Sequence, residues 1–422
     1  MASNHSPCVS AGLAVAAALL IACGAGEPPV APDPPRAEEG PPPIAAPPPP
    51  RGLWVLCEGS QRVLENRPRL KLLLEDARGL GVTDLFVQVY RGGRAWFDSS
   101  LADPAPYAST WRTDEDIARD AFSVLIERAH AQGLRVHAWV NVLSLSSNAD
   151  APILRDLGPA AAAVDQKGRS VLDYPGFEVP EPDRRYYRMG TPALWLDPAA
   201  SGVADRLAAT FAELVQRYPA LDGLHLDYIR YPDALPFSPG TRFGVGLSFG
   251  FGEGSRARFE AESGLRAPFG SSLANGNRWD DWRRSQLTRL VRGIAAAARS
   301  LRPEVAISAA VLADAERAYL VDFQDWLGWL DEGLLDFAVP MLYTRDQRLL
   351  RYGVEEMSGL AAERVIWVGV GSWLFSASPQ RAVEQLRQVA EHERLGSSLF
   401  SWDALRESPE LREALVAEVS GE

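Results

Sequence analysis

Cysteine is scarce in this sequence, which excludes a fold built around disulfides. Only three cysteines occur among the 422 residues. Cys8 precedes an N-terminal apolar run and Cys23 ends it, so Cys57 alone remains free when that segment is processed. An intramolecular disulfide is then impossible. The chain must instead fold around a large hydrophobic core, for which its length is ample.

Basic residues and long apolar runs are also in short supply. The net charge is -12 and the pI is about 5.1, whereas proteins that bind nucleic acid generally present a basic face to the phosphates. Nucleic acid is therefore not an expected partner. The apolar run Ala11–Ala22 is too short to span a bilayer and has the length of a signal-peptide core.

The end of this run, Leu20-Ile-Ala-Cys23, resembles a bacterial lipobox. The resemblance implies that residues 1–23 are a lipoprotein signal segment and that Cys23 carries the lipid anchor. Gly24 is not the aspartate that often marks retention in the inner membrane, which favours the outer membrane of the cell envelope. The segment Met1–Ser10 lacks Lys and Arg, unlike most export signals.

Residues 24–50 are rich in Pro, Ala and Glu and include the run Pro47–Pro50. This composition favours extended polyproline II and cannot form a core. At about 3.1 Å per residue, such a linker could hold a folded domain up to roughly 80 Å from its anchor. We therefore expect the folded domain to begin at Arg51.

From Arg51 onward, short β-branched and aromatic runs alternate with helical patterns, as in repeated βα units. An open doubly wound sheet would usually have fewer strands and a glycine-rich turn after the first one. We predict an α/β fold, a closed (β/α)8 TIM barrel over residues 51–422. Its eight strands are expected at 52–57, 84–90, 135–141, 223–228, 305–311, 337–343, 365–370 and 398–402.

Apolar stripes predict helices at 116–132, 203–218 and 282–299. Two long insertions interrupt the alternation, Val142–Pro192 after the third strand and Pro232–Arg278 after the fourth. Each follows a strand and precedes a helix. We therefore expect both on the C-terminal face of the barrel, as walls or covers of an active-site cleft.

The fourth run, Leu221–Pro232, holds the most informative candidates. Its alternation directs His225 and Asp227 to the same side, into the barrel. Reactive groups of barrel enzymes lie at the C-terminal strand ends, and an unpaired buried carboxylate is costly. We interpret Asp227 as catalytic; the structural alternative is a polar plug that pairs Asp227 with His225 or Arg230.

His137 on the third strand raises a metal site with His225 and Asp227 as another alternative. No closely spaced ligand motif accompanies these residues. We therefore predict no metal and no other cofactor.

Motifs in the expected barrel order resemble the glycosyl hydrolase-like 10 family of bacterial envelope proteins, also called the DUF187 family. The resemblance covers nearly the whole chain after the linker. It implies a TIM barrel, export and hydrolysis of glycan chains, with peptide-free peptidoglycan strands as the best-supported substrate. The motifs are Arg51-Gly-Leu-Trp-Val, Phe86-Val-Gln-Val, Arg94-Ala-Trp-Phe-Asp-Ser, Val136-His-Ala-Trp-Val-Asn, Trp195-Leu-Asp-Pro, Asp222-Gly-Leu-His-Leu-Asp-Tyr-Ile-Arg-Tyr-Pro and Pro340-Met-Leu-Tyr.

This chain departs from the family where many members carry a second acidic residue, because Tyr228 follows Asp227. A mechanism with two carboxyl groups must then take its second group from another strand, and the candidates are Asp346, Asp314 and Glu58. Whether such hydrolysis retains or inverts configuration stays open.

A looser resemblance is to chitinase-type barrels, which carry a Met-x-Tyr sixth strand like Met341-Leu-Tyr343. It implies that Tyr343 holds the N-acetyl group of a sugar. Ile229 stands where those enzymes carry their catalytic glutamate.

We predict a glycoside hydrolase whose partners are an envelope polysaccharide and, through Cys23, the membrane. Asp227 is the expected general acid or base, with Asp346 or Glu58 as its partner. The alternatives are an inert glycan-binding lipoprotein and a metal-dependent hydrolase; the exact sugar and the oligomeric state stay open. The substrate-binding candidates are Tyr90, Asn141, His225, Tyr228, Arg230, Asp314, Tyr343, Trp373 and Trp402.

Overall fold

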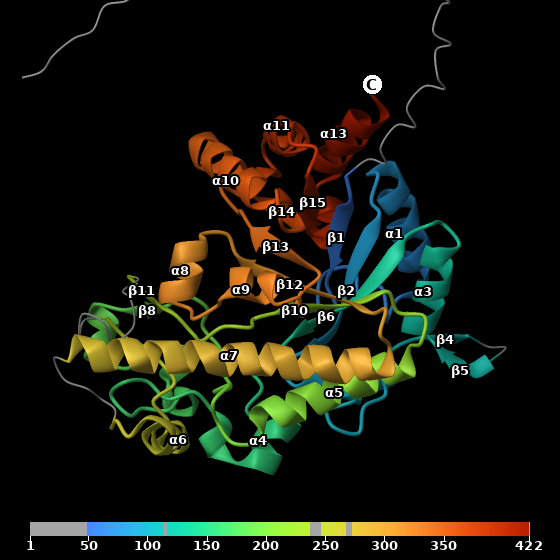
Figure 1. Ribbon diagram of the computed structural model, residues 1–422. Coiled ribbons are helices and arrows are strands. Elements are labelled where there is room, and N and C mark those ends of the chain that lie inside the picture. The colour runs from blue at the N-terminus through green and yellow to red at the C-terminus, as the bar shows by residue number, and fades with distance from the viewer. Residues whose placement is uncertain (1–48, 114–115, 237–245, 267–271, 422) are drawn as a thin grey trace, which may run out of the picture. The chain divides into compact units, whose positions relative to one another are not determined.

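A computed structural model describes residues 49–113, 116–236, 246–266 and 272–421 (Figure 1). The signal segment 1–23, including Cys23, and the linker up to residue 48 lie outside the described residues. Eight parallel strands close into a barrel, because β1 is hydrogen-bonded to both β2 and β15. They are β1 (Arg51–Val55), β2 (Asp84–Arg91), β6 (Arg135–Asn141), β10 (Gly223–Asp227), β12 (Ala306–Leu312), β13 (Phe337–Met341), β14 (Ile366–Gly371) and β15 (Leu395–Phe400).

The predicted TIM barrel is confirmed, and each of its strands overlaps a run expected from the sequence. Aromatic side chains fill the interior, among them Trp54, Phe86 and Trp367. His225 points inward as its alternation predicts and stacks on Phe86 with ring centroids 4.2 Å apart. The barrel is therefore a packed core, and solvent reaches polar groups only at its ends.

Helices surround the barrel (Figure 1), and none that the structure describes is both long and apolar enough to cross a membrane. The expected helix at 203–218 is confirmed as α5, and that at 282–299 lies within the longer α7. The helices are α1 (Arg67–Gly79), α3 (Ala121–His130), α5 (Val203–Arg217), α7 (Leu273–Leu301), α8 (Ala315–Leu320), α9 (Trp326–Asp331), α10 (Gln347–Leu360), α11 (Pro379–Ala390), α12 (Trp402–Glu407) and α13 (Pro409–Ser420).

The helix expected at 116–132 begins later than predicted. Asp116–Asp120 form strand β5, which pairs with β4 (Arg112–Thr113), and α3 starts at Ala121. The Asp120 carboxylate accepts a hydrogen bond from the backbone N–H of Ser123 at 2.9 Å, which fixes the start of the helix.

The two predicted insertions are joined to each other. In the first, β7 (Ser144–Ser146) pairs with β9 (Leu194–Trp195), which lies just beyond the end of the insertion, and β8 (Arg188–Met189) pairs with β11 (Ala234–Leu235) of the second. Smaller elements complete the loops of this face. They are β3 (Arg94–Ala95) and α2 (Ala105–Ala108) after β2, α4 (Pro152–Leu157) in the first insertion and α6 (Glu253–Ser263) in the second.

Candidate active site

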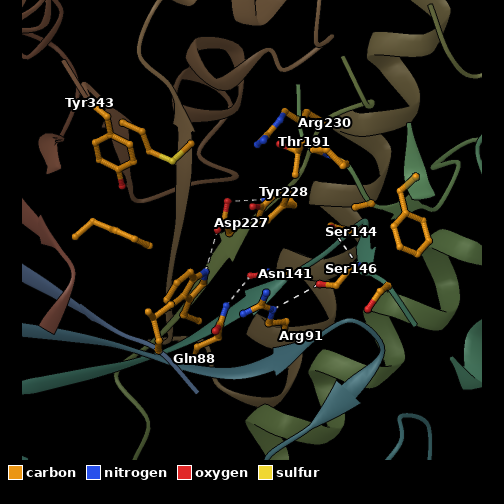
Figure 2. Close-up of a pocket in the computed structure, with 18 residues that line it drawn as sticks. Gln88, Arg91, Asn141, Ser144, Ser146, Thr191, Asp227, Tyr228, Arg230 and Tyr343 are labelled. Atoms are coloured by element: carbon orange, nitrogen blue, oxygen red, sulfur yellow. Dashed lines mark hydrogen bonds between the residues drawn. The ribbon is translucent and has the colours of Figure 1, made fainter. Parts of the chain in front are cut away.

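A pocket of about 480 Å³ opens at the C-terminal ends of the barrel strands (Figure 2). Strand ends form its floor, and the insertion after β6 supplies one wall, as predicted. No described residue of the insertion after β10 lines it. The lining residues are Leu56, Gln88, Arg91, Trp139, Asn141, Ser144, Ser146, Ser147, Phe177, Thr191, Pro192, Ala193, Asp227, Tyr228, Arg230, Met341, Tyr343 and Phe400.

Asp227 is the only acidic residue among these lining residues, and its side chain is almost fully buried. Its carboxyl oxygens accept hydrogen bonds from the Trp139 indole N–H at 3.1 Å and from the Tyr228 backbone N–H at 2.7 Å. Removal from water raises the pKa of Asp227 above its ordinary value, and the opposing effects of Arg230 and the two hydrogen bonds are smaller. A raised pKa favours the protonated form of a carboxyl group, which is the form that can donate a proton to a leaving group.

The chain turns sharply directly after Asp227. Tyr228 has a positive φ of 55°, in the left-handed region that side chains other than glycine rarely adopt. This turn lets the Tyr228 backbone N–H reach back to the Asp227 carboxyl group. Strain of this kind concentrates at functional sites, where the surrounding structure maintains it.

Tyr343 lies across the pocket from Asp227 (Figure 2). Its hydroxyl is buried and has no hydrogen-bond partner in the described part of the chain. Burial, together with the nearby Asp227 and Tyr228, raises its pKa, so the phenol keeps its proton. A buried hydroxyl without a partner is costly, and a ligand that accepts its hydrogen bond would remove that cost.

Five of the predicted site residues line this one pocket: Asp227, Asn141, Tyr228, Arg230 and Tyr343. The structure does not bring the expected second carboxyl group there. Asp346 and Asp314 are exposed and cap the N-termini of α10 and α8 through backbone N–H groups. Hydrogen bonds from the backbone of Leu349 and Arg348 lower the pKa of Asp346.

The third candidate carboxylate, Glu58, is held by ion pairs. It lies 2.8 Å from Arg94 and 3.4 Å from Arg91. Glu58 therefore contacts the pocket only through Arg91. Neither Glu58 nor Asp346 lines the pocket, which contradicts the prediction that one of them is the catalytic partner of Asp227. Both groups are engaged elsewhere, Glu58 by guanidinium groups and Asp346 by a helix N-terminus.

Tyr90 faces away from the pocket, contrary to expectation. The register between β2 and β6 shifts between Gln88 and Tyr90, so strict alternation fails at Val89. Gln88 lies before the shift on the same inward face as Phe86, lines the pocket and donates to Asn141 Oδ1 at 3.1 Å. Tyr90 instead packs edge-on against Phe211 of α5.

The other expected binding residues also lie outside the pocket. His225 is fully buried below it and accepts a hydrogen bond from the Trp54 indole at 3.1 Å. Trp402 is fully buried and donates to Asp76, so it cannot stack on a sugar. Trp373 is 39% exposed and packs edge-on against Tyr343 beside the pocket.

The structure does not assemble the alternative metal site. His137 contacts Asp84 Oδ1 at 2.8 Å through Nε2, and His225 contacts Ser308 Oγ at 2.9 Å through Nδ1. Burial lowers the pKa of His225, which keeps it neutral. The described residues contain no group of three or more His, Cys, Asp or Glu side chains arranged to hold a metal ion.

Sequence reasoning missed several lining residues. Ser144, Ser146 and Thr191 come from the insertion after β6, where no periodicity indicates which side chains face inward. Trp139 could have been found, because it lies two residues before Asn141 on the same face of β6.

These observations define the class of the protein. It is a (β/α)8 barrel with a polar pocket around a buried carboxyl group at the C-terminal ends of its strands. The chain belongs to the glycosyl hydrolase-like 10 family, whose sequence profile matches residues 49–385.

Named relatives agree with this assignment. The chain is 25% identical to the glycosyl hydrolase DigH of Escherichia coli K12, over 64% of this chain and 56% of that protein. It is 23% identical to the glycosyl hydrolase YngK of Bacillus subtilis, over 67% and 50%. The chain thus matches about half the length of these relatives.

Solved structures share the fold. The catalytic domain of a β-amylase from Paenibacillus polymyxa matches with a TM-score of 0.53 and 15% identity, over 84% of this chain and 93% of that chain. An α-L-fucosidase from Paenibacillus thiaminolyticus matches with a TM-score of 0.54 and 13% identity, over 88% and 49%. At these identities the likeness establishes the barrel fold alone.

Proposed function

We propose that this protein is a glycoside hydrolase that cleaves N-acetylated glycan strands of the bacterial envelope, with peptide-free peptidoglycan as its substrate. The observation that carries the proposal is Asp227, a buried carboxyl group with a raised pKa in a polar pocket at the strand ends. Family membership and the names of the relatives support glycosidase chemistry.

Among the described residues that line the pocket, no second carboxyl group accompanies Asp227, which favours assistance by the substrate. In the first step, the carbonyl oxygen of the sugar's acetamide attacks the anomeric carbon. The bond to the leaving sugar breaks, its electron pair stays on the glycosidic oxygen, and Asp227 protonates that oxygen. Water then opens the cyclic intermediate and returns a proton to Asp227, so two displacements retain the configuration.

Tyr343 has a defined part in this scheme. Its buried hydroxyl, which lacks a partner in the described chain, can donate to the acetamide carbonyl and orient it toward the anomeric carbon. A site built on that hydrogen bond discriminates against sugars without the acetyl group.

A catalytically inert glycan receptor is the second candidate function. The same observation favours it, because a pocket with one carboxyl group can bind a sugar without hydrolysing it. Both functions predict that the pocket binds the same glycan, but only the hydrolase would cleave it and release short sugars.

The location of the protein completes the proposal. A lipid on Cys23 would anchor the chain in the envelope, and the linker at 24–50 would let the barrel reach glycan strands at a distance from the membrane. The proposed site of anchoring is the outer membrane.

The deciding experiment incubates the full chain, purified in detergent, with peptide-free peptidoglycan strands and follows the products by mass spectrometry. Release of short sugars distinguishes the hydrolase from the receptor. Proton NMR of the first product should detect the retained anomer. An inverted first product would contradict assistance by the acetamide, and binding without products would favour the receptor.

A further inference from the structure

Arg230 is a buried cation that lines the pocket (Figure 2). Its side chain is 7% exposed, and its Nη1 has no hydrogen-bond partner in the part of the chain that the structure describes. The guanidinium packs instead over the rings of Tyr228 and Trp195, with centroids 4.8 and 5.7 Å away. Buried charges in proteins are usually paired, so this arrangement indicates an anionic partner from outside the chain.

Asp322, which interacts electrostatically with Arg230, does not meet this need. Asp322 lies 3.9 Å from Arg317, an ion-pair distance, and neither of its oxygens is hydrogen-bonded to a described residue. Asp227, on the pocket side, accepts its hydrogen bonds from Trp139 and Tyr228. The guanidinium of Arg230 therefore remains available to a ligand in the pocket.

Arg91 places a second guanidinium on the pocket wall. Its Nε lies 3.4 Å from Glu58 Oε2 and 3.5 Å from Ser146 Oγ. Glu58 also pairs with Arg94 at 2.8 Å. One carboxylate thus serves two guanidinium groups, which leaves a net positive charge beside the pocket.

The charge of the pocket contrasts with that of the whole chain. The chain carries a net charge of -12, whereas the lining residues include two arginines and one aspartate. Burial favours the neutral form of that aspartate. Hydroxyl donors from Ser144, Ser146 and Thr191 lie on the same wall. A neutral sugar requires no such positive charge, whereas a planar guanidinium matches a carboxylate through two parallel hydrogen bonds.

We propose that the pocket selects a sugar that carries a carboxylate, and that Arg230, assisted by Arg91, binds this group. The inference rests on the proposed glycosidase function and deepens it by naming the residues that bind the carboxylate of the substrate. The carboxylate could be an ether-linked substituent, as on the strands of peptidoglycan, or belong to the ring of a uronic acid. Both present the same anion to the guanidinium groups.

Three N-acetylated substrates separate these cases: peptide-free peptidoglycan strands, hyaluronan oligosaccharides and chitin oligosaccharides. The first carries ether-linked carboxylates, the second carries ring carboxylates, and the third is neutral. The full chain in detergent should cleave one or both acidic substrates, and kcat/KM for chitin should be roughly 10- to 100-fold lower than for the preferred one. The preferred acidic substrate identifies the source of the carboxylate, and a preference for hyaluronan would support the inference while overturning peptide-free peptidoglycan as the proposed substrate.

Two modifications test the arginines. Arg230→Gln should lower kcat/KM on the preferred acidic substrate by roughly 10- to 100-fold, mainly through KM, and Arg230→Lys should recover part of the loss. Amidation of the substrate carboxylates with methylamine should cause a similar loss for the wild type and little further loss for Arg230→Gln. Arg128→Gln, an exposed arginine on α3, is the matched control and should behave as wild type. If Arg230→Gln does not fold, Arg91→Gln and the amidated substrate still test the inference.

The outcomes are distinguishable. Cleavage of chitin as fast as of both acidic substrates, or indifference of the wild type to amidation, overturns the inference and leaves the glycosidase function intact. Failure of the wild type to cleave any of the three overturns the proposed function as well.

Discussion

Asp227 and Asp346 are the same residue type in opposite environments, and this decides their chemistry. The Asp227 carboxyl group is buried at the end of β10, where loss of water raises its pKa. The Asp346 carboxylate is exposed at the N-terminus of α10, where backbone N–H groups lower its pKa. Of the two, only Asp227 has its pKa shifted in the direction that favours a proton donor.

Asp227→Asn should reduce kcat on glycan strands by about 10²–10⁴-fold, equivalent to roughly 3–5 kcal/mol, because the amide cannot donate a proton. The measurement is steady-state turnover together with the melting temperature, which should stay close to that of the wild type. Asp346→Asn is the matched control and should leave turnover unchanged, since Asn also caps helices well. If Asp227→Asn folds stably and its turnover is undiminished, Asp227 has a structural role and not a catalytic one.

The pH profile should report the same group. Because the proposed reaction needs the protonated Asp227, kcat should fall as the pH rises through its raised pKa. Removal of the nearby positive charge in Arg230→Gln should raise that pKa further and move the falling limb to higher pH. If the falling limb of the pH profile does not move in Arg230→Gln, the charge of Arg230 does not affect the pKa of Asp227.

Tyr343→Phe removes only the hydroxyl. Turnover of N-acetylated strands should drop by roughly 10-fold or more, because the acetamide loses the donor that orients it. De-N-acetylated strands lack the acetamide that attacks the anomeric carbon, so their binding is compared instead, and the Kd for them should change less than the Kd for N-acetylated strands. Turnover of the N-acetylated strands and binding of both, with Tyr352→Phe on the exposed face of α10 as control, make the comparison. An equal loss of affinity for both would contradict recognition of the acetyl group.

Asp322 interacts electrostatically with Arg230 and makes the stability of the fold depend on pH. Burial and the nearby Asp233 raise its pKa from 3.8 to about 7. Between pH 3.8 and about 7, Asp322 therefore keeps a proton in the folded chain that it has already lost in the unfolded chain. This contribution to stability is present at acid pH and is lost as the pH rises toward 7.

Asp322→Asn should remove that loss, because the amide stays neutral at every pH. The free energy of unfolding at pH 8 should rise by up to about 4 kcal/mol, the value of roughly three pKa units. Urea unfolding at pH 4 and pH 8 is the measurement, and little change is expected at pH 4. An equal effect at both values would show that ionisation of Asp322 is not its cause.

At the scale of elements, helix caps and one strand irregularity decide which side chains reach the pocket. The irregularity in β2 after Gln88 turns Tyr90 away from the pocket and toward α5. Caps occupy Asp314 and Asp346 at exposed helix starts. Each feature removes from the pocket a residue that sequence alone would place there.

Asp120 joins two elements and should be important for stability. It caps α3 through the Ser123 backbone N–H and accepts the buried Tyr218 hydroxyl at 2.7 Å. Asp120→Ala should destabilise the fold by about 2–4 kcal/mol, the sum of a lost cap and a buried hydroxyl without a partner. Chemical denaturation would measure this, with Asp314→Ala at the exposed cap of α8 as a control of smaller effect. A similar small loss in both would contradict the role of the buried hydroxyl.

At the scale of the whole molecule, the barrel strands form the floor of the pocket, and one of its walls lies outside the barrel. The insertion after β6 forms that wall, and the pairing of β8 with β11 braces it against the insertion after β10. The second insertion thus supports the pocket without lining it through any described residue. Variation in these loops can change the substrate while the barrel stays the same.

Attachment to the membrane is the remaining prediction at this scale. Cys23→Ser should release the protein from the membrane fraction, because the proposed lipid on that cysteine is its only proposed anchor. Fractionation with labelled palmitate is the measurement, and Cys57→Ser, a buried cysteine of the barrel, is the control. Retention of label and membrane association in Cys23→Ser would exclude the lipoprotein hypothesis.

The sequence by itself determined the barrel and the centre of its pocket. Eight apolar runs in βα alternation require a closed parallel sheet, and the pattern of β10 directs Asp227 to the end of the barrel interior. Tyr343 follows by the same logic at the end of β13. These features depend on strand periodicity, which is a local property of the chain.

Only the tertiary structure decided which polar groups surround Asp227. It removed the expected second carboxyl group, because Glu58 is bound by arginines and Asp346 caps a helix. It brought Arg91 at the end of β2 to the same pocket as Arg230, which follows β10 and which the sequence already indicated. The physical reason is that ion pairs, caps and strand register depend on neighbours in space, whereas periodicity depends only on neighbours along the chain.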